Sequence, residues 1–180
     1  MKGQFGYGIT LFAEDEFYKS ILFEDNYGLE ISFEKSFSKS ISFNIKPKFG
    51  TEIIRVDAPY QARNKGLGLG IELKPSDEFK LNFRMDQSKS IRFENDEVVY
   101  SDMIARARFE YQATTFLNFR LVAQYHRYYD TFDIQPLISY QPGPFSIFYF
   151  GTSRTYDTGF PGWKESYGQI YLKVQKLFSF

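Results

Sequence analysis

Residues 167–180 read YGQIYLKVQKLFSF, an alternating stretch that continues to the final residue of the sequence. Apolar side chains occupy every second position except one, at Ile170, Leu172, Val174, Phe178 and Phe180. A period of two is typical of a β-strand with one apolar face. Because the ends of soluble domains are usually frayed, an apolar strand that continues to a terminal phenylalanine predicts a strand held in a membrane.

This ending resembles the closing strand of bacterial outer-membrane β-barrels, whose terminal aromatic residue is part of the signal read by the insertion machinery. The resemblance implies that Phe178 and Phe180 form a membrane-insertion signal. It also implies a location in the bacterial outer membrane, with outer-membrane lipid, the barrel-insertion machinery and other envelope proteins as partners.

The composition restricts the classes of function. The 180 residues include 22 basic and 22 acidic side chains, and this zero net charge predicts no nucleic-acid partner and confines electrostatic function to local clusters. Cysteine is absent, which excludes thiolate metal sites, catalytic thiols and disulfides. No stretch approaches the roughly 18 to 20 consecutive apolar residues of a membrane helix, so the sequence could span a membrane only as a β-barrel.

The first residues, MKGQFGYG, lack the apolar core of a signal peptide. An exported protein would have lost such a peptide during secretion. We therefore expect a mature form with an added Met1, or a fragment of something longer.

Period-two alternation dominates the sequence, and helical periodicity is absent over any long window. The predicted strands are 5–12, 27–35, 38–49, 65–73, 79–87, 102–111, 116–128, 133–140, 145–152 and the final stretch. Their lengths suit the roughly 9 to 11 residues of a tilted membrane strand, and their number is even, as bacterial barrels generally require. We therefore predict an all-β fold, a single domain over residues 1–180. Its architecture would be an antiparallel transmembrane up-and-down β-barrel of about ten strands, complete or part of a larger barrel or assembly.

The connections between these strands alternate between short and long. Short turns are predicted at 36–37, 75–77, 113–114 and 141–144, and longer connections at 13–26, 50–64, 88–101, 129–132 and 155–166. Outer-membrane barrels have short periplasmic turns and longer external loops. The pattern therefore predicts that the short turns and the C-terminus are periplasmic.

A soluble β-sandwich or lipocalin-like barrel would alternate in the same way, but it would bury its apolar face inside. The position of the aromatic residues favours a membrane. They lie near predicted strand ends, as two interfacial girdles require, at Tyr27, Phe49, Phe79, Tyr111, Tyr125, Tyr140, Phe145 and Tyr167.

A family resemblance covers about the last third of the sequence. The segment ISYQPGPFSIFYFGTSRTYD, followed by QIYLKVQKLFSF, resembles the C-terminal part of large outer-membrane proteins. Those proteins join an N-terminal domain similar to family-nine carbohydrate-binding modules to a long barrel. The shared features are a tyrosine, a Pro-Gly turn, a hairpin strand and a closing strand with Leu-Phe near the end. Since the binding module and most of a long barrel are missing, the resemblance implies a split-off final portion or a compact relative.

His126 is the only histidine and the one catalytic candidate. It lies on a polar strand face with Asp130 and Asp133 close in sequence, where a carboxylate could polarise it as a base. Arg127 and Tyr128 follow it, in place of the His-x-Ser spacing of barrel lipases. We therefore predict a hydrogen-bonded structural role for His126 and a non-enzymatic protein.

Metal and phosphate motifs are equally incomplete. One histidine and no cysteine give no transition-metal constellation, so no metal and no cofactor are predicted. Oxygen donors gather at residues 94–97, which we interpret as a solvated acidic loop. Gly66, Gly68 and Gly70 lie inside a strand and precede no helix, so we expect them to leave room on the polar face.

The polar face carries the best functional lead, a predicted lumen charge cluster. Basic residues occupy three consecutive strands and acidic residues occupy an early strand: Lys80, Arg84, Arg106, Arg108 and Arg120 against Glu30 and Glu34. Such segregation would create a field across a lumen that selects solutes by charge. The alternative is that these residues pair with Glu72, Asp86 and Glu110 and fill a narrow interior.

The sequence therefore predicts an integral outer-membrane barrel that acts as a small or plugged pore, or as the membrane-embedded part of an envelope assembly. Two alternatives remain open. One is a barrel enzyme acting on lipid or peptide at the outer rim through His126. The other is a soluble β-barrel that binds an apolar ligand.

Overall fold

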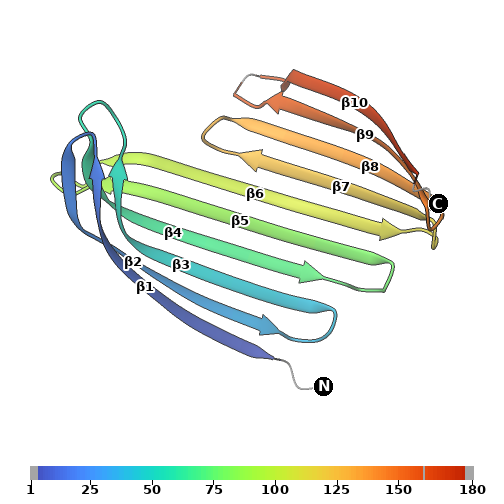
Figure 1. The fold of residues 1–180 in the computed structure, drawn as a ribbon, viewed down its shortest axis with the longest axis horizontal. Helices are drawn as coiled ribbons and strands as arrows, with labels where there is room; N and C mark the ends of the chain where they lie inside the picture. The colour runs from blue at the N-terminus through green and yellow to red at the C-terminus, as the bar shows by residue number, and fades with distance from the viewer. Residues whose placement is uncertain (1–3, 160, 177–180) are drawn as a thin grey trace. The chain divides into compact units, whose positions relative to one another are not determined.

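The computed structural model describes residues 4–159 and 161–176, which form one ten-stranded sheet (Figure 1). The strands follow in sequence order: β1 (Phe5–Tyr18), β2 (Ile21–Ser36), β3 (Ile41–Ile54), β4 (Tyr60–Leu73), β5 (Phe79–Arg92), β6 (Val98–Gln112), β7 (Leu117–His126), β8 (Thr131–Gly143), β9 (Ser146–Asp157) and β10 (Lys164–Lys176). Among the described residues no helix is long and apolar enough to cross a membrane. The predicted all-β, antiparallel up-and-down arrangement of ten strands is confirmed.

The predicted closure into a barrel is not seen. Within the described residues the strand order ends at β1 and β10, and the sheet is open. Strands adjacent in sequence meet through short turns, whereas closure would join the two strands farthest apart in the chain and require a fixed stagger between them. Phe178 and Phe180, the predicted insertion signal, lie outside the described residues.

The described residues belong to two compact units that share several strands. The first lies within Met1–Ser38, Ser42–Gly70 and Met85–Met103, and the second within Lys39–Ile41, Ile71–Arg84 and Ile104–Phe180.

In the first unit, strand register builds continuous apolar rows across β1, β2 and β3. Tyr7 pairs with Phe33, which pairs with Ile45. Leu11 pairs in the same way with Leu29 and then with Phe49. Because side chains alternate between faces, the opposite face carries polar residues from the positions between them.

The first predicted long loop, 13–26, is wrong. β1 and β2 continue into it as paired strands, with Glu14 opposite Asn26 and Glu16 opposite Phe23 beyond a bulge. The turn itself is Lys19 and Ser20, with φ angles of 47° and 64°. Positive φ at both central residues suits a two-residue hairpin turn, although glycine or asparagine is the usual choice. Acidic side chains conceal the apolar alternation here, but backbone pairing does not depend on it.

Three of the other four predicted long connections also shorten, whereas the predicted 129–132 keeps its length of four residues as 127–130. Strands extend so that the remaining connections are 19–20, 55–59, 93–97, 127–130 and 158–163, alternating with 37–40, 74–78, 113–116 and 144–145. The two sets differ little in length, so the predicted contrast of short turns and long loops is wrong.

In the second unit, an apolar row crosses five strands. It consists of Tyr111, Phe119, Ile138, Phe150 and Leu172, each opposite the next. The neighbouring row on the other face consists of Glu110, Arg120, Leu137, Gly151 and Tyr171, and it begins with two charged residues. The alternation seen in the sequence therefore becomes two chemically different faces.

Few hydrophobic side chains are buried among the described residues: Phe23, Ile53, Ala62 and Val122. Large apolar side chains are exposed even away from the edge strands, with Phe49 at 47% and Phe150 at 53%. Polar side chains are buried instead, at Asn26, Ser90 and Asp102. The sheet thus lacks a conventional apolar core.

Candidate functional site

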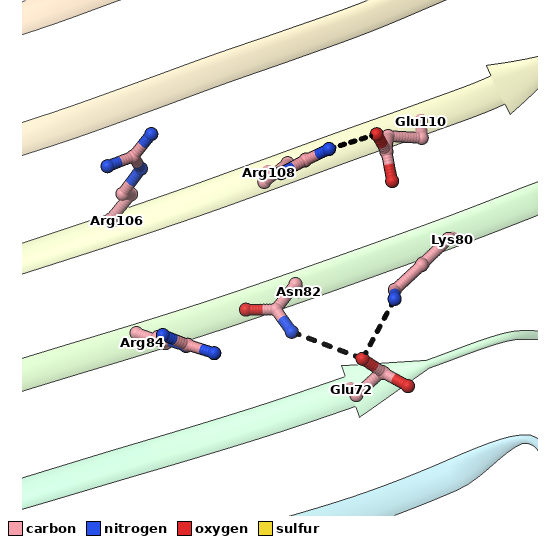
Figure 2. A pocket seen from close by; sticks show the side chains of 7 residues that line it. All are labelled: Glu72, Lys80, Asn82, Arg84, Arg106, Arg108 and Glu110. Carbon is pink, nitrogen blue, oxygen red and sulfur yellow. Dashed lines mark hydrogen bonds and ion pairs between the residues drawn. The ribbon is translucent and has the colours of Figure 1, made fainter.

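The second unit contains a hollow of about 390 Å³ on its polar face (Figure 2). We refer to it as the basic hollow. Its lining residues come from β4, β5 and β6: Glu72, Lys80, Asn82, Arg84, Arg106, Arg108 and Glu110. They share one face because residues two apart along a strand point the same way. Four of the residues of the predicted charge cluster therefore lie together here.

Two of these four cations have carboxylate partners. Lys80 Nζ lies 3.1 Å from Glu72 Oε2, and Asn82 donates a hydrogen bond to the same oxygen over 3.3 Å. Arg108 forms an ion pair with Glu110 on its own strand. These contacts, drawn in Figure 2, neutralise one end of the basic hollow.

Arg84 and Arg106 lie at the other end. The Gln112 N–H donates to the Glu78 carbonyl over 2.8 Å, and antiparallel counting from this bond places Arg84 opposite Arg106 on the adjacent strand. Figure 2 shows both side chains without an ion pair, and neither makes one within the described residues. Both are exposed. The lining thus holds four cations and two carboxylates, a surplus of two positive charges.

Arg120 lies beside the basic hollow and does not line it. It is opposite Glu110 on β6 and Leu137 on β8. Its Nε atom is buried, with no hydrogen-bond partner among the described residues. This donor extends the excess of positive character across β7.

The predicted acidic residues belong to the first unit. Glu30 forms an ion pair with Lys48, at 2.9 Å between Oε2 and Nζ. Glu34 lies opposite Asn44 and Gly6. The predicted acidic sector is therefore partly neutralised within its own unit.

A polar network that sequence reasoning missed lies in the first unit. Ser90, which is fully buried, donates to Glu52 Oε1, and Asn64 donates to Glu52 Oε2 over 2.8 Å and to the Ser88 hydroxyl over 3.2 Å. No sequence signal links residues 52, 64 and 90, because strand register brings them together.

One glycine of β4 leaves room on the polar face as predicted. A Cβ at Gly70 would overlap the side-chain amide of Asn44 on β3, whereas at Gly66 and Gly68 it would meet the Cβ atoms of Lys48 and Lys46 at ordinary contact distances of 3.4 and 3.5 Å. Gly70 therefore makes space for a polar side chain of β3.

His126, the catalytic candidate, packs edge-on against Tyr129, with ring centroids 4.6 Å apart. Asp133 accepts a hydrogen bond from the Thr155 hydroxyl over 2.5 Å. In the acidic segment, Asp96 pairs with Arg63 and Glu97 with Arg92. Within residues 4–159 and 161–176, no three histidine, aspartate or glutamate side chains group to hold a metal ion.

Outside the strands, in the connection before β5, the Ser76 hydroxyl donates to the Glu78 carboxylate. This hydrogen bond lowers the pKa of Glu78. It ties together the turn that precedes Lys80.

Comparison with known proteins adds no relative: no protein-family model, no curated protein and no solved structure matches the chain. The resemblance to the barrel domain of proteins with a carbohydrate-binding-module-like domain therefore stays a prediction. The two faces of the sheet and the basic hollow are the features of the described residues that bear on function.

Proposed function

We propose that the chain forms the wall of a bacterial outer-membrane β-barrel, a non-enzymatic protein whose polar face lines a small or plugged pore. It would act alone or as the membrane-embedded part of an envelope assembly. The observation that carries the proposal is the exposed apolar face, built from rows such as Tyr111, Phe119, Ile138, Phe150 and Leu172.

The cost of leaving these rows in water supports a lipid environment. Tyr7, Leu11 and Leu172 are 76%, 73% and 71% exposed, and full burial of a large apolar side chain is worth about 1.5–3 kcal/mol. A folded domain has a net stability of only about 5–15 kcal/mol. A face made of many such side chains is favoured next to lipid tails, which cover it without a second protein layer.

Strand length supports the same environment. In β2 the ten residues from Tyr27 to Ser36, and in β3 the nine residues from Ile41 to Phe49, carry the apolar rows. These lengths fit the roughly 9 to 11 residues that a tilted strand needs to cross the hydrocarbon core. Tyr27 and Phe49 would then lie at the membrane interface, and the acidic residues of the strand extensions, at 14–16 and 24–25, would stand in water.

In a membrane, the free edges of β1 and β10 need partners, because lipid offers no hydrogen bonds. We propose that β1 and β10 pair to close the barrel, or that further strands complete a larger one. Outer-membrane lipid and the barrel-insertion machinery would be its partners, with Phe178 and Phe180 read as the insertion signal.

Folding in detergent tests the membrane proposal. We expect the denatured chain to refold only in detergent or lipid, into a β-rich form that migrates differently on gels before and after heating. The control is the same refolding in plain buffer. A stable monomer there would overturn the proposal and favour the soluble barrel that binds an apolar ligand.

Planar-bilayer recording tests the pore. We expect salt-dependent conductance with a preference for anions, because the basic hollow holds surplus positive charge. Replacing Arg106 and Arg108 with glutamate should reduce or reverse this preference. A silent membrane containing folded protein would favour a plugged anchor.

A further inference from the structure

We infer that Arg84 and Arg106 form a binding site for doubly charged oxyanion groups, the phosphate or sulfate of a small solute. The inference rests on the proposed function, because it takes the polar face to be the face that solutes reach. It goes beyond a general preference for anions, since it assigns one pair of side chains and one ligand chemistry.

Arg84 and Arg106 bring two like charges together on adjacent strands. Residues directly opposite each other on antiparallel strands have Cβ atoms about 4.5–5.5 Å apart, and two like charges in such a pair destabilise the sheet. Arg84 and Arg106 occupy such a pair, and neither has a carboxylate partner within the described residues. An anion held between the guanidinium groups would relieve this repulsion.

The other two cations of the basic hollow differ from this pair because each has a carboxylate partner. Lys80 is paired with Glu72, and Arg108 with Glu110. An anion that approached either cation would meet a carboxylate as well. The surplus of two positive charges is therefore concentrated at Arg84 and Arg106 (Figure 2).

The chemistry of the two arginines indicates the class of ligand. Guanidinium groups present planar pairs of donors that match phosphate and carboxylate oxygens. A surplus of two positive charges favours a dianion over a monocarboxylate. The lining contains no apolar residue, and its volume of about 390 Å³ leaves space beyond the charged group. These features favour a small polar solute that carries a phosphate or sulfate group.

The experiment uses the full chain, isotope-labelled and folded in alkyl-glycoside micelles, which contain no phosphate. Sodium phosphate is titrated at constant ionic strength against sodium chloride, and amide chemical shifts are followed. We expect saturable shifts centred on residues 82–84 and 106–108, with sulfate competing and chloride not. Arg106→Gln, and independently Arg84→Gln, should weaken phosphate binding about tenfold, the effect of losing one hydrogen bond to a charged group.

Arg154→Gln is the matched control. It also removes one positive charge from the second unit, but Arg154 pairs with Glu165, at 2.8 Å, and does not line the basic hollow. Its phosphate affinity should equal that of the unmodified chain. Equal affinity in Arg106→Gln and the unmodified chain, or equal binding of chloride and phosphate, would overturn the inference.

Two further measurements distinguish a lipid headgroup from a soluble ligand, and the phosphate site from the pore. Micelles doped with an anionic phospholipid should weaken inorganic phosphate binding if a lipid headgroup reaches the site, and leave it unchanged if only soluble ligands do. Conductance without saturable phosphate binding would contradict the phosphate site and support the pore. Phosphate binding in micelles together with a silent bilayer would support the phosphate site and contradict the pore.

Discussion

Ion pairs occur in both units of the sheet, but the second unit also holds two like charges on adjacent strands that have none. In the first unit, charges are neutralised locally: Glu30 by Lys48, and Arg55 by Glu16, whose two oxygens lie 2.8 and 3.0 Å from the same nitrogen. In the second unit, Arg84 and Arg106 occupy opposite positions on adjacent strands without a counter-charge inside the described residues.

This difference separates structural from binding roles among the charged side chains of the polar face. A polar group that is satisfied within the protein stabilises the fold, and one that is left unsatisfied costs free energy unless a ligand completes it. The first unit therefore fits a structural role, and the second fits a binding role.

The largest expected effect is in the first unit. Glu52→Ala would leave the buried Ser90 hydroxyl and the Asn64 amide without their acceptor, and it should lower the free energy of unfolding by about 2–3 kcal/mol. Urea titration of the detergent-folded chain, followed by circular dichroism, measures this change.

Glu72→Ala in the second unit is the matched control for that variant. Its lysine partners are 44% and 38% exposed, so the loss should stay within about 1 kcal/mol. Equal losses in the two variants would contradict the contrast between the units.

An intermediate effect is expected where aromatic rings cover glycines at the two edges of the sheet. Phe12 lies over Gly28 in the first unit, and Tyr171 lies over Gly151 in the second. Replacing either ring with alanine should cost about 0.5–1 kcal/mol. Similar losses of unfolding free energy in urea titration would show that an aromatic ring over a glycine stabilises both units. Lys173→Ala on β10, which uncovers no glycine, is the control.

The smallest effect reverses its sign between the units. Arg84→Ala removes like-charge repulsion and should raise the free energy of unfolding by about 0.5 kcal/mol, whereas Arg55→Ala removes an ion pair and should lower it by a similar amount. Both changes should fade at about 1 M salt. Fluorescence of Trp163, the only tryptophan, follows the second unit directly. A destabilised Arg84→Ala would mean that this arginine is already neutralised.

Sequence alone could predict the strands but not their ends. In 27–35 and 79–87 one face of the strand is apolar and the other is polar. The resulting alternation of side chains can be read directly from the sequence. The continuation of β1 and β2 to the Lys19–Ser20 turn is not visible, because the acidic runs 14–16 and 24–25 interrupt the apolar alternation before Phe17 pairs with Leu22. For the same reason the sequence predicts long loops at 13–26, 50–64 and 88–101, where the structure has extended strands.

The candidate site was predictable only in part. The basic residues on three strands share a face by parity alone. That Arg84 lies opposite Arg106 depends on register, which follows from the turn that joins β5 to β6 and has no signature in composition. The pairing of Glu52 with Ser90 and Asn64 has the same origin.

The free edge of β1 has a consequence for handling the protein. Residues 5–12, FGYGITLF, carry no charge and no proline, and β1 is hydrogen-bonded along one side only among the described residues. An uncharged strand edge with unpaired backbone groups is a template for intermolecular cross-β assembly. Fibril growth in detergent-free, concentrated samples is thus expected to start from β1 (Figure 1), and Thr10→Lys, on the polar face opposite Glu30, is the natural gatekeeper against it.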